Sequence, residues 1–168
     1  QGSLVAAMLQ VAIADPLDEA EWMAFMSIKE VMELGEWVLE HRTPKWFLGW
    51  RRITNTTNER TLIASLLPRA GVGDSFFLMF SKQRTPKLLG ILVASLCSFV
   101  LDYVTRQKLG GTNLNYHQFN QLAVLPPETY SHSTLWDREI SLQEWIIPRV
   151  LELVYAAWDL KPFAQDCG

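Results

Sequence analysis

Residues 88–101 read LLGILVASLCSFVL and contain no charged side chain. Apolar residues fall on every face of a helix drawn through them, which predicts a helix enclosed by other elements. Thr85-Pro86 fits the start of that helix, as N-cap and first helical position. Gly110-Gly111 fits its end, where a left-handed residue is common. We therefore predict one central buried helix from about 86 to 108.

The segments around this helix predict a small sheet. WFLGWRRI (46–53) and RTLIASLL (60–67) have the composition of strands and are separated by the turn-forming residues TNTTNE (54–59). Residues 75–80 fit a third strand, and LAVL (122–125) fits a fourth, short one. We therefore expect an α+β fold, with a small mixed or antiparallel sheet packed against several helices.

The N-terminal part of the chain predicts an acidic helix. Leu4 to Ala14 is apolar and fits either a strand or a short buried helix. Asp15-Pro16 then fits a helix start, and the helical pattern continues to about residue 41. Gly35 leaves open a division into two helices, because a glycine inside a helix costs about 1 kcal/mol relative to alanine.

The C-terminal part predicts further helical segments. Asn115 fits the cap of a single turn over residues 116–121. SLQE (141–144) fits a capping box that opens a helix to about residue 159, kinked at Pro148. We do not expect the tail 161–168 to be ordered throughout.

Length and composition predict one globular domain. The chain has 168 residues, of which 49% are hydrophobic, enough for a proper core. Residues 1–3 resemble the remnant of a cleaved tag, so we assign the domain to residues 4–168. Within it we distinguish an acidic helical segment (4–42), a basic α/β core (43–127) and a loop followed by a C-terminal helix (128–168).

The cysteines and the absence of targeting patterns predict a cytoplasmic protein. Cys97 lies inside the apolar stretch and Cys167 is next to last, so they form neither a disulfide framework nor a metal-ligand spacing. No secretory signal pattern follows the first residues. The stretch 88–101 is too short to cross a bilayer, so we expect no membrane association.

Charge is segregated along the chain. The net charge of −3 conceals eight acids and one base in residues 1–41, three acids and eleven bases in 42–108, and seven acids and three bases in 109–168. A central block of +8 between acidic flanks can present a basic face to phosphates while the flanks face other protein. Scattered solvated lysines and arginines would give the same totals.

A search for catalytic and metal-binding patterns finds none. His41, His117 and His132 have no zinc or iron spacing to a cysteine or a carboxylate. The Gly-x-Gly at 71–73 lacks a third glycine and precedes a strand, so it fits a turn better than a nucleotide-binding loop. We therefore expect no catalytic, metal-binding or cofactor-binding residues in this segment.

Two polar clusters carry residue types that contact nucleic acid. Arginine and lysine bind phosphates or guanine, asparagine and glutamine can pair with adenine, and threonine and backbone amides fix register. Each residue also has a local structural use, as a turn former at 54–58 or as a cap at 113 and 115. The candidate DNA-binding residues are Arg51, Arg52, Thr54, Asn55, Thr57, Asn58 and Arg60 in the first cluster, and Arg106, Gln107, Lys108, Gly110, Gly111, Thr112, Asn113, Asn115 and Tyr116 in the second.

At these clusters the sequence resembles the C-terminal region of TaqI-like adenine-N6 DNA methyltransferases, which include fused restriction–modification enzymes and phage-defence methylases. The family pattern has an N-x-R-T strand, a helix ending D-Y-x-x-R-x-K-x-G-G-T and a Q-L-P-V-x-P strand. The matching segments are RRITNTTNERTLIASLLP (51–68), LVASLCSFVLDYVTRQKLGGTNLN (92–115), QLAVLPP (121–127) and LELVYAAWDLKPFA (151–164). Ala123 replaces the proline usual in the third.

The resemblance implies a piece of a larger enzyme. The family needs a fold for S-adenosylmethionine with a glycine-rich loop, and an Asn/Asp-Pro-Pro-Tyr/Phe motif for the extruded adenine, and this chain has neither. The cofactor is therefore implied for the parent protein and not for this segment. The implied partners are double-stranded DNA and the catalytic domain of the parent chain. The expected function is target recognition, and the alternative is a structural or protein-interaction module that contacts no DNA.

Overall fold

The structure is a computed structural model that describes residues 28–81 and 85–168. The chain divides into two compact units, Gln1–Lys45 and Trp46–Gly168. This division lies close to the expected change from the acidic segment to the basic core. Each unit is described separately below.

In the first unit, the described residues form helix α3 (Ile28–Arg42) and a short exit from it. The helix continues through Gly35, so the division into two helices that the sequence left open is not observed. The element expected at Leu4 to Ala14 and the helix start expected at Asp15-Pro16 lie outside the described residues.

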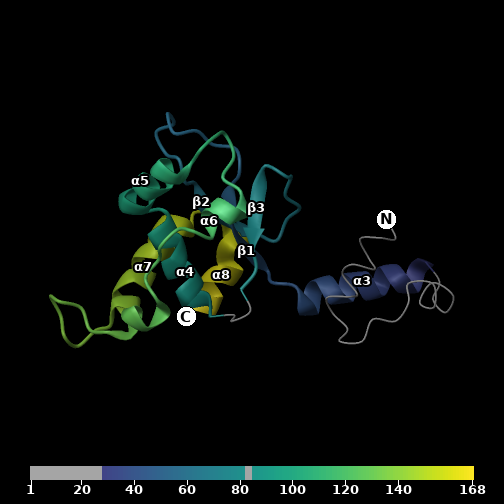
Figure 1. Ribbon diagram of the computed structural model, residues 1–168. Coiled ribbons are helices and arrows are strands. Elements are labelled where there is room, and N and C mark those ends of the chain that lie inside the picture. The colour runs from purple at the N-terminus through teal and green to yellow at the C-terminus, as the bar shows by residue number, and fades with distance from the viewer. Residues whose placement is uncertain (1–27, 82–84) are drawn as a thin grey trace. The chain divides into compact units, whose positions relative to one another are not determined.

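The second unit contains an antiparallel sheet of three strands (Figure 1). The strands are β1 (Trp46–Arg51), β2 (Ala64–Pro68) and β3 (Phe76–Met79), in the order β2-β1-β3. The predicted hairpin is confirmed, because β1 pairs with β2 in a register that places Trp46 opposite Pro68. The α+β class is likewise confirmed.

The central strand β1 buries large side chains on one face, and on the other face its backbone approaches β3 closely. Trp46, Leu48 and Trp50 alternate along the strand and are almost completely buried, as the period of two requires. Gly49 points to the other side, where a Cβ would lie 2.2 Å from the carbonyl oxygen of Phe77 on β3. A side chain at position 49 would therefore force the two strands apart.

Helix α4 (Pro86–Leu96) packs against strand β2 of the sheet and against the C-terminal helices α7 (Leu142–Val154) and α8 (Lys161–Cys167) (Figure 1). A Cβ at Gly90 would lie 3.2 Å from side-chain atoms of both Ile147 and Phe163, so the glycine allows close helix packing. This part of the core comprises Trp46, Leu48, Leu66, Ile91, Val93, Tyr130, Ile147, Val150, Leu160, Phe163 and Cys167.

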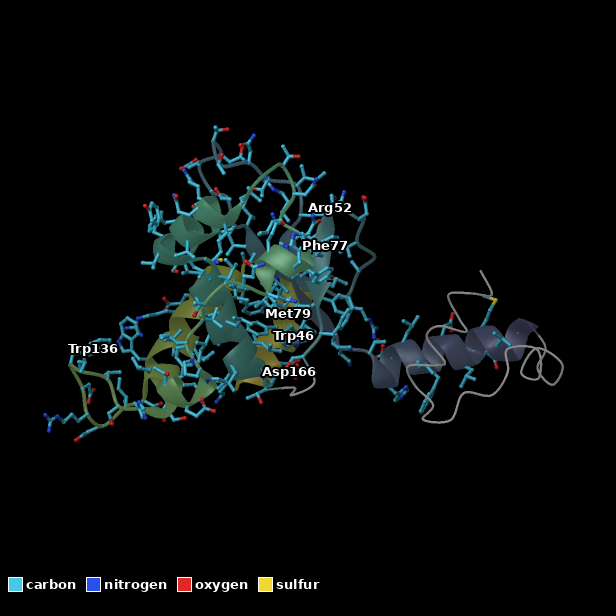
Figure 2. The ribbon with its side chains drawn as sticks, in the orientation of Figure 1. Trp46, Arg52, Phe77, Met79, Trp136 and Asp166 are labelled. Carbon is cyan, nitrogen blue, oxygen red and sulfur yellow. The ribbon has the colours of Figure 1, made fainter. Side chains whose placement is uncertain are left out.

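The C-terminal tail completes this core. The tail was not expected to be ordered throughout, and that prediction was wrong, because α8 buries Phe163 and Cys167 completely. Phe163 meets the ring of Trp46 edge to face at 4.9 Å, and the Trp46 Nε1–H donates to Asp166 at 2.7 Å (Figure 2). Apolar contact and one indole hydrogen bond thus hold the tail against β1.

The single central helix predicted over 86–108 is two helices in the structure. Helix α4 ends at Leu96, and α5 (Phe99–Lys108) begins after Ser98, at an angle of 66° to α4. Ser98 is extended, and its hydroxyl accepts a hydrogen bond from the Leu101 N–H at 3.2 Å, as an N-cap does. A serine with a local partner therefore stops one helix and starts the next.

Two further expectations were wrong. Residues 122–125 do not form a strand, because Val124 and Leu125 are exposed and the following prolines lack N–H donors for a ladder. The C-terminal helix begins with the predicted capping box but ends at Val154 instead of continuing to about 159. Pro148 lies inside α7, as the sequence predicted. At the capping box, the hydrogen bonds from the Ser141 backbone and side chain lower the pKa of Glu144.

Candidate nucleic-acid interface

The structure brings the two polar clusters together. The backbone N–H of Thr54 donates to the carbonyl of Thr112 at 3.0 Å, and the N–H of Leu114 donates to Arg52 at 2.7 Å. Between these bonds, Ile53 and Asn113 form an antiparallel bridge. Residues about 60 positions apart in sequence therefore form one surface, which we call the paired loops: residues 52–62 and residues 107–114.

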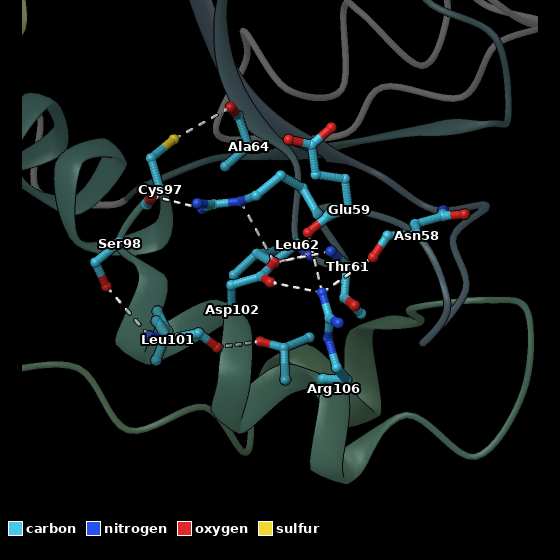
Figure 3. A network of polar contacts seen from close by, with 12 residues as sticks. Asn58, Glu59, Thr61, Leu62, Ala64, Cys97, Ser98, Leu101, Asp102 and Arg106 are labelled. Carbon is cyan, nitrogen blue, oxygen red and sulfur yellow. Dashed lines mark hydrogen bonds and ion pairs between the residues drawn. The ribbon is translucent and has the colours of Figure 1, made fainter.

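Asp102 on α5 connects the first loop to the helix (Figure 3). Its carboxylate is almost completely buried, and one of its oxygens accepts from the backbone N–H groups of Thr61 and Leu62, both at 2.8 Å. Such charge-assisted bonds are stronger than those between neutral groups. The loop that follows the hairpin tip is thus fixed to α5 by a buried acid.

Two arginines of the candidate set bind to the same carboxylate. The Nε of Arg60 lies 3.6 Å from Asp102, and an Nη of Arg60 bonds to the carbonyl of Cys97 at 2.5 Å. An Nη of Arg106 lies 3.2 Å from Asp102 and donates to the carbonyls of Asn58 and Glu59, both at 3.0 Å (Figure 3). Arg60 and Arg106 therefore stabilise the loop itself.

The hairpin tip is built by local hydrogen bonds. Thr54 is buried, and its hydroxyl donates to the Thr61 carbonyl at 2.6 Å. The Asn55 side-chain oxygen accepts from the Thr57 N–H at 3.1 Å, an arrangement that mimics a backbone turn. With its amide oriented to satisfy both neighbours, Asn58 accepts from Arg51 and from the Asn55 N–H. The turn-forming role that the sequence allowed is present.

Arg51 and Arg52 at the end of β1 are half-buried. Arg52 lies 3.4 Å from Asp74 and 5.5 Å from the centre of the Phe77 ring (Figure 2). Within the described residues the Nε–H groups of both arginines are buried and have no acceptor. Arg51 also lines an open hollow of about 390 Å³; its other lining residues are Asn58, Glu59, Arg60 and Ile63.

The second loop has a different character. Gln107, Lys108 and Thr112 are exposed, and a Cβ at Gly110 or Gly111 would meet no described atom within 4 Å. The left-handed glycine expected here is absent from the described backbone at this loop, because α5 ends on Leu109 in an extended conformation. Leu109 is buried and its N–H donates to the Thr105 carbonyl, so the helix ends on an anchored apolar residue and not on a glycine turn.

Beyond this loop, the remaining candidates contribute to packing. The Asn115 N–H donates to the Gln118 side chain at 3.0 Å and opens the one-turn helix α6 (Tyr116–Phe119), as predicted. Tyr116 stacks on Phe77 at 4.5 Å, and its hydroxyl donates to the carbonyl of Leu78 at 2.9 Å. These contacts attach α6 to β3.

Sequence reasoning missed Asp102, Thr61 and Thr105. Thr105 is completely buried and bonds to the Leu101 carbonyl at 2.8 Å. A signal for Asp102 was present, because it is one of three acids in the basic block and precedes Arg106 by one helical turn. One of the few acids in a basic block, placed one helical turn before an arginine, is a candidate internal partner for the arginines.

The described residues offer little for nucleophilic or metal chemistry. Burial raises the pKa of the Cys97 thiol, which Arg60 opposes, and raises the pKa of Cys167 to about 11. Both thiols are therefore protonated at neutral pH and are poor nucleophiles. No group of three or more potential metal-ligating side chains occurs among the residues that the structure describes.

No single helix within the described ranges is long and apolar enough to cross a membrane, and α4 and α5 meet that test only as a bent pair. Comparison of the chain with models of protein families, with curated proteins and with solved structures finds no match.

Proposed function

We propose that the second unit is a DNA-binding, target-recognition module of an adenine-N6 DNA methyltransferase of a restriction–modification or phage-defence system. The observation that carries this proposal is the joining of the paired loops by the backbone bonds between residues 52–54 and 112–114. The segments that carry the resemblance also contact each other through Asp102, Thr61 and Arg106.

The free donors of the second loop supply the contacts. Lys108 and Gln107 are exposed at the end of α5, and no ion pair of Lys108 is present among the described residues. Gly110-Gly111 lets the backbone come close to a phosphate, because no Cβ stands in the way. Arg51 adds a second cationic position at the open hollow beside the hairpin tip.

The Asp102 network favours a second candidate, a structural module of the same kind of enzyme that contacts no DNA. Arg60 and Arg106 are bound to the protein itself, and Asn55 forms a turn. On this alternative, the polar residues are explained by turn and loop chemistry, and the exposed apolar side chains contact another protein domain.

The methyl donor belongs, on this proposal, to another part of the parent protein. The loop at Gly71–Gly73 leads into β3 and not into a helix N-terminus, so it offers no cradle for a nucleotide. Calorimetry of the chain with S-adenosylmethionine should give no saturable heat. The proposed location is the cytoplasm, where a DNA methylase of this kind would act.

Titration with DNA separates the two candidates. We expect saturable binding of a fluorescent duplex at about 50 mM salt and an affinity that falls by more than tenfold at about 200 mM, because phosphate contacts release counterions. An affinity below detection at low salt, or one that is independent of salt, would favour the structural module.

A further inference from the structure

The outward face of α5 carries apolar side chains in solvent. Phe99, Val100 and Tyr103 are 82%, 76% and 64% exposed. They lie within one helical turn of each other, and Gln107 continues the row at the same four-residue spacing. Single exposed apolar residues are ordinary, whereas a contiguous exposed apolar patch is typical of an interaction surface. We call Phe99, Val100 and Tyr103 the α5 aromatic face.

The exposure follows from how α5 is fixed. The bend after α4 and the Ser98 cap direct α5 away from the line of the core helix (Figure 1). The helix then buries its opposite side, with Leu101, Asp102 and Thr105. The apolar residues at 99 and 100, which the sequence predicted to be enclosed, are consequently outside the core.

A fixed cation lies beside this face. The Arg60 guanidinium is 4.9 Å from the centre of the Phe99 ring and is fixed by the Cys97 carbonyl and by Asp102. Arg106 lies on the same helix, one turn beyond Asp102. Aromatic rings next to positioned arginines are the combination with which proteins bind unstacked nucleobases, because the ring stacks on the base and the cation attracts the phosphate.

We propose that the α5 aromatic face stacks on unpaired bases of DNA bound by the paired loops. This inference rests on the proposed function and adds a surface outside the two polar clusters. A base within an intact duplex has both faces covered by its neighbours, so the stack requires a base that is extrahelical or unpaired. Charge favours DNA over an apolar protein surface, because Arg60 and Arg106 share the single carboxylate of Asp102 and the network that includes the guanidinium at Phe99 therefore keeps a net positive charge.

Two DNA probes of identical length test the inference, namely an intact duplex and a duplex with a one-nucleotide bulge. The full chain should bind the bulged duplex more tightly in fluorescence titrations. Phe99→Ala and Tyr103→Ala should each weaken binding to the bulged duplex at least about fivefold, and change the intact duplex less than about twofold. Leu153→Ala on α7 is the matched control, because it removes an equally exposed apolar side chain from another helix.

The outcomes are distinguishable. Equal affinity for both probes, unchanged in the Phe99 and Tyr103 variants, overturns this inference and leaves the proposed function intact. Failure to bind either probe overturns both. If the variants retain the preference for the bulge but change the sedimentation of the chain, the face binds a second copy and the inference is wrong. Because the substituted side chains are exposed, thermal melts should match the wild type and exclude misfolding as the cause.

Discussion

The paired loops contain the same kinds of residue and use them differently. In residues 52–62, arginines, asparagines and threonines bond to one another and to Asp102, so the loop is organised from within. In the second loop, Gln107, Lys108 and Gly110 are exposed. A basic or amide side chain can thus either stabilise the loop through internal hydrogen bonds or remain exposed and available to a ligand. Its hydrogen-bond partners distinguish the two roles.

The largest effect is expected from Asp102→Ala. The substitution leaves two backbone N–H groups buried without an acceptor and removes the shared partner of Arg60 and Arg106. We expect the free energy of unfolding to fall by about 3 kcal/mol in urea denaturation. Asp74→Ala is the control, because this exposed acid pairs only with Arg52 among the described ion pairs and should cost less than about 0.5 kcal/mol. Equal losses would mean that Asp102 does not organise the loop.

Next in size is the difference between Arg106→Ala and Lys108→Ala. Arg106 donates to the carbonyls of Asn58 and Glu59, so its removal should lower the free energy of unfolding by about 1–2 kcal/mol. Lys108 is exposed at the helix end, and its removal should change stability by less than about 0.5 kcal/mol. Thermal and urea denaturation of both variants would check the difference. If Arg106→Ala leaves the free energy of unfolding unchanged, Arg106 does not stabilise the first loop and resembles the exposed residues of the second loop.

A smaller effect is expected at Asn55, where two substitutions separate turn from readout. Asn55→Ala removes the acceptor of the Thr57 N–H and should cost about 1 kcal/mol of stability. Asn55→Asp keeps that acceptor and should leave stability nearly unchanged. If the Asn55 amide also reads a base, the aspartate variant should bind the cognate site less tightly while it remains folded. Loss of stability in both variants would show that the turn depends on more than this oxygen.

The fold was largely predictable because its signals are local. Alternating burial in β1, the polar turn after it and the capping box at Ser141 each act over a few residues. The break at Ser98 was not predicted, although its cap to the Leu101 N–H is local, because the uncharged run 88–101 fits one continuous apolar helix. The strand predicted at 122–125 does not form. Its composition fits a strand, but no strand among the described residues pairs with it.

The candidate site was predictable in its location and less so in its roles. The two clusters were identified by residue type, but their joining through Thr54 and Thr112 is a tertiary contact that spacing does not encode. The engagement of Arg60 and Arg106 depends on a buried acid 42 residues from Arg60 in sequence, which residue type alone does not reveal. Pattern analysis finds polar residues, whereas only their partners show which remain available to a ligand.

The most direct measurement is the salt dependence of DNA affinity in the wild type and in Lys108→Ala. If Lys108 contacts a phosphate, the slope of log affinity against log salt should fall in magnitude by about one unit, equally on all duplex sequences. Lys161→Ala removes a lysine charge from α8 and should leave the slope unchanged. Equal slopes in the wild type and both variants would contradict the assignment of the second loop to DNA.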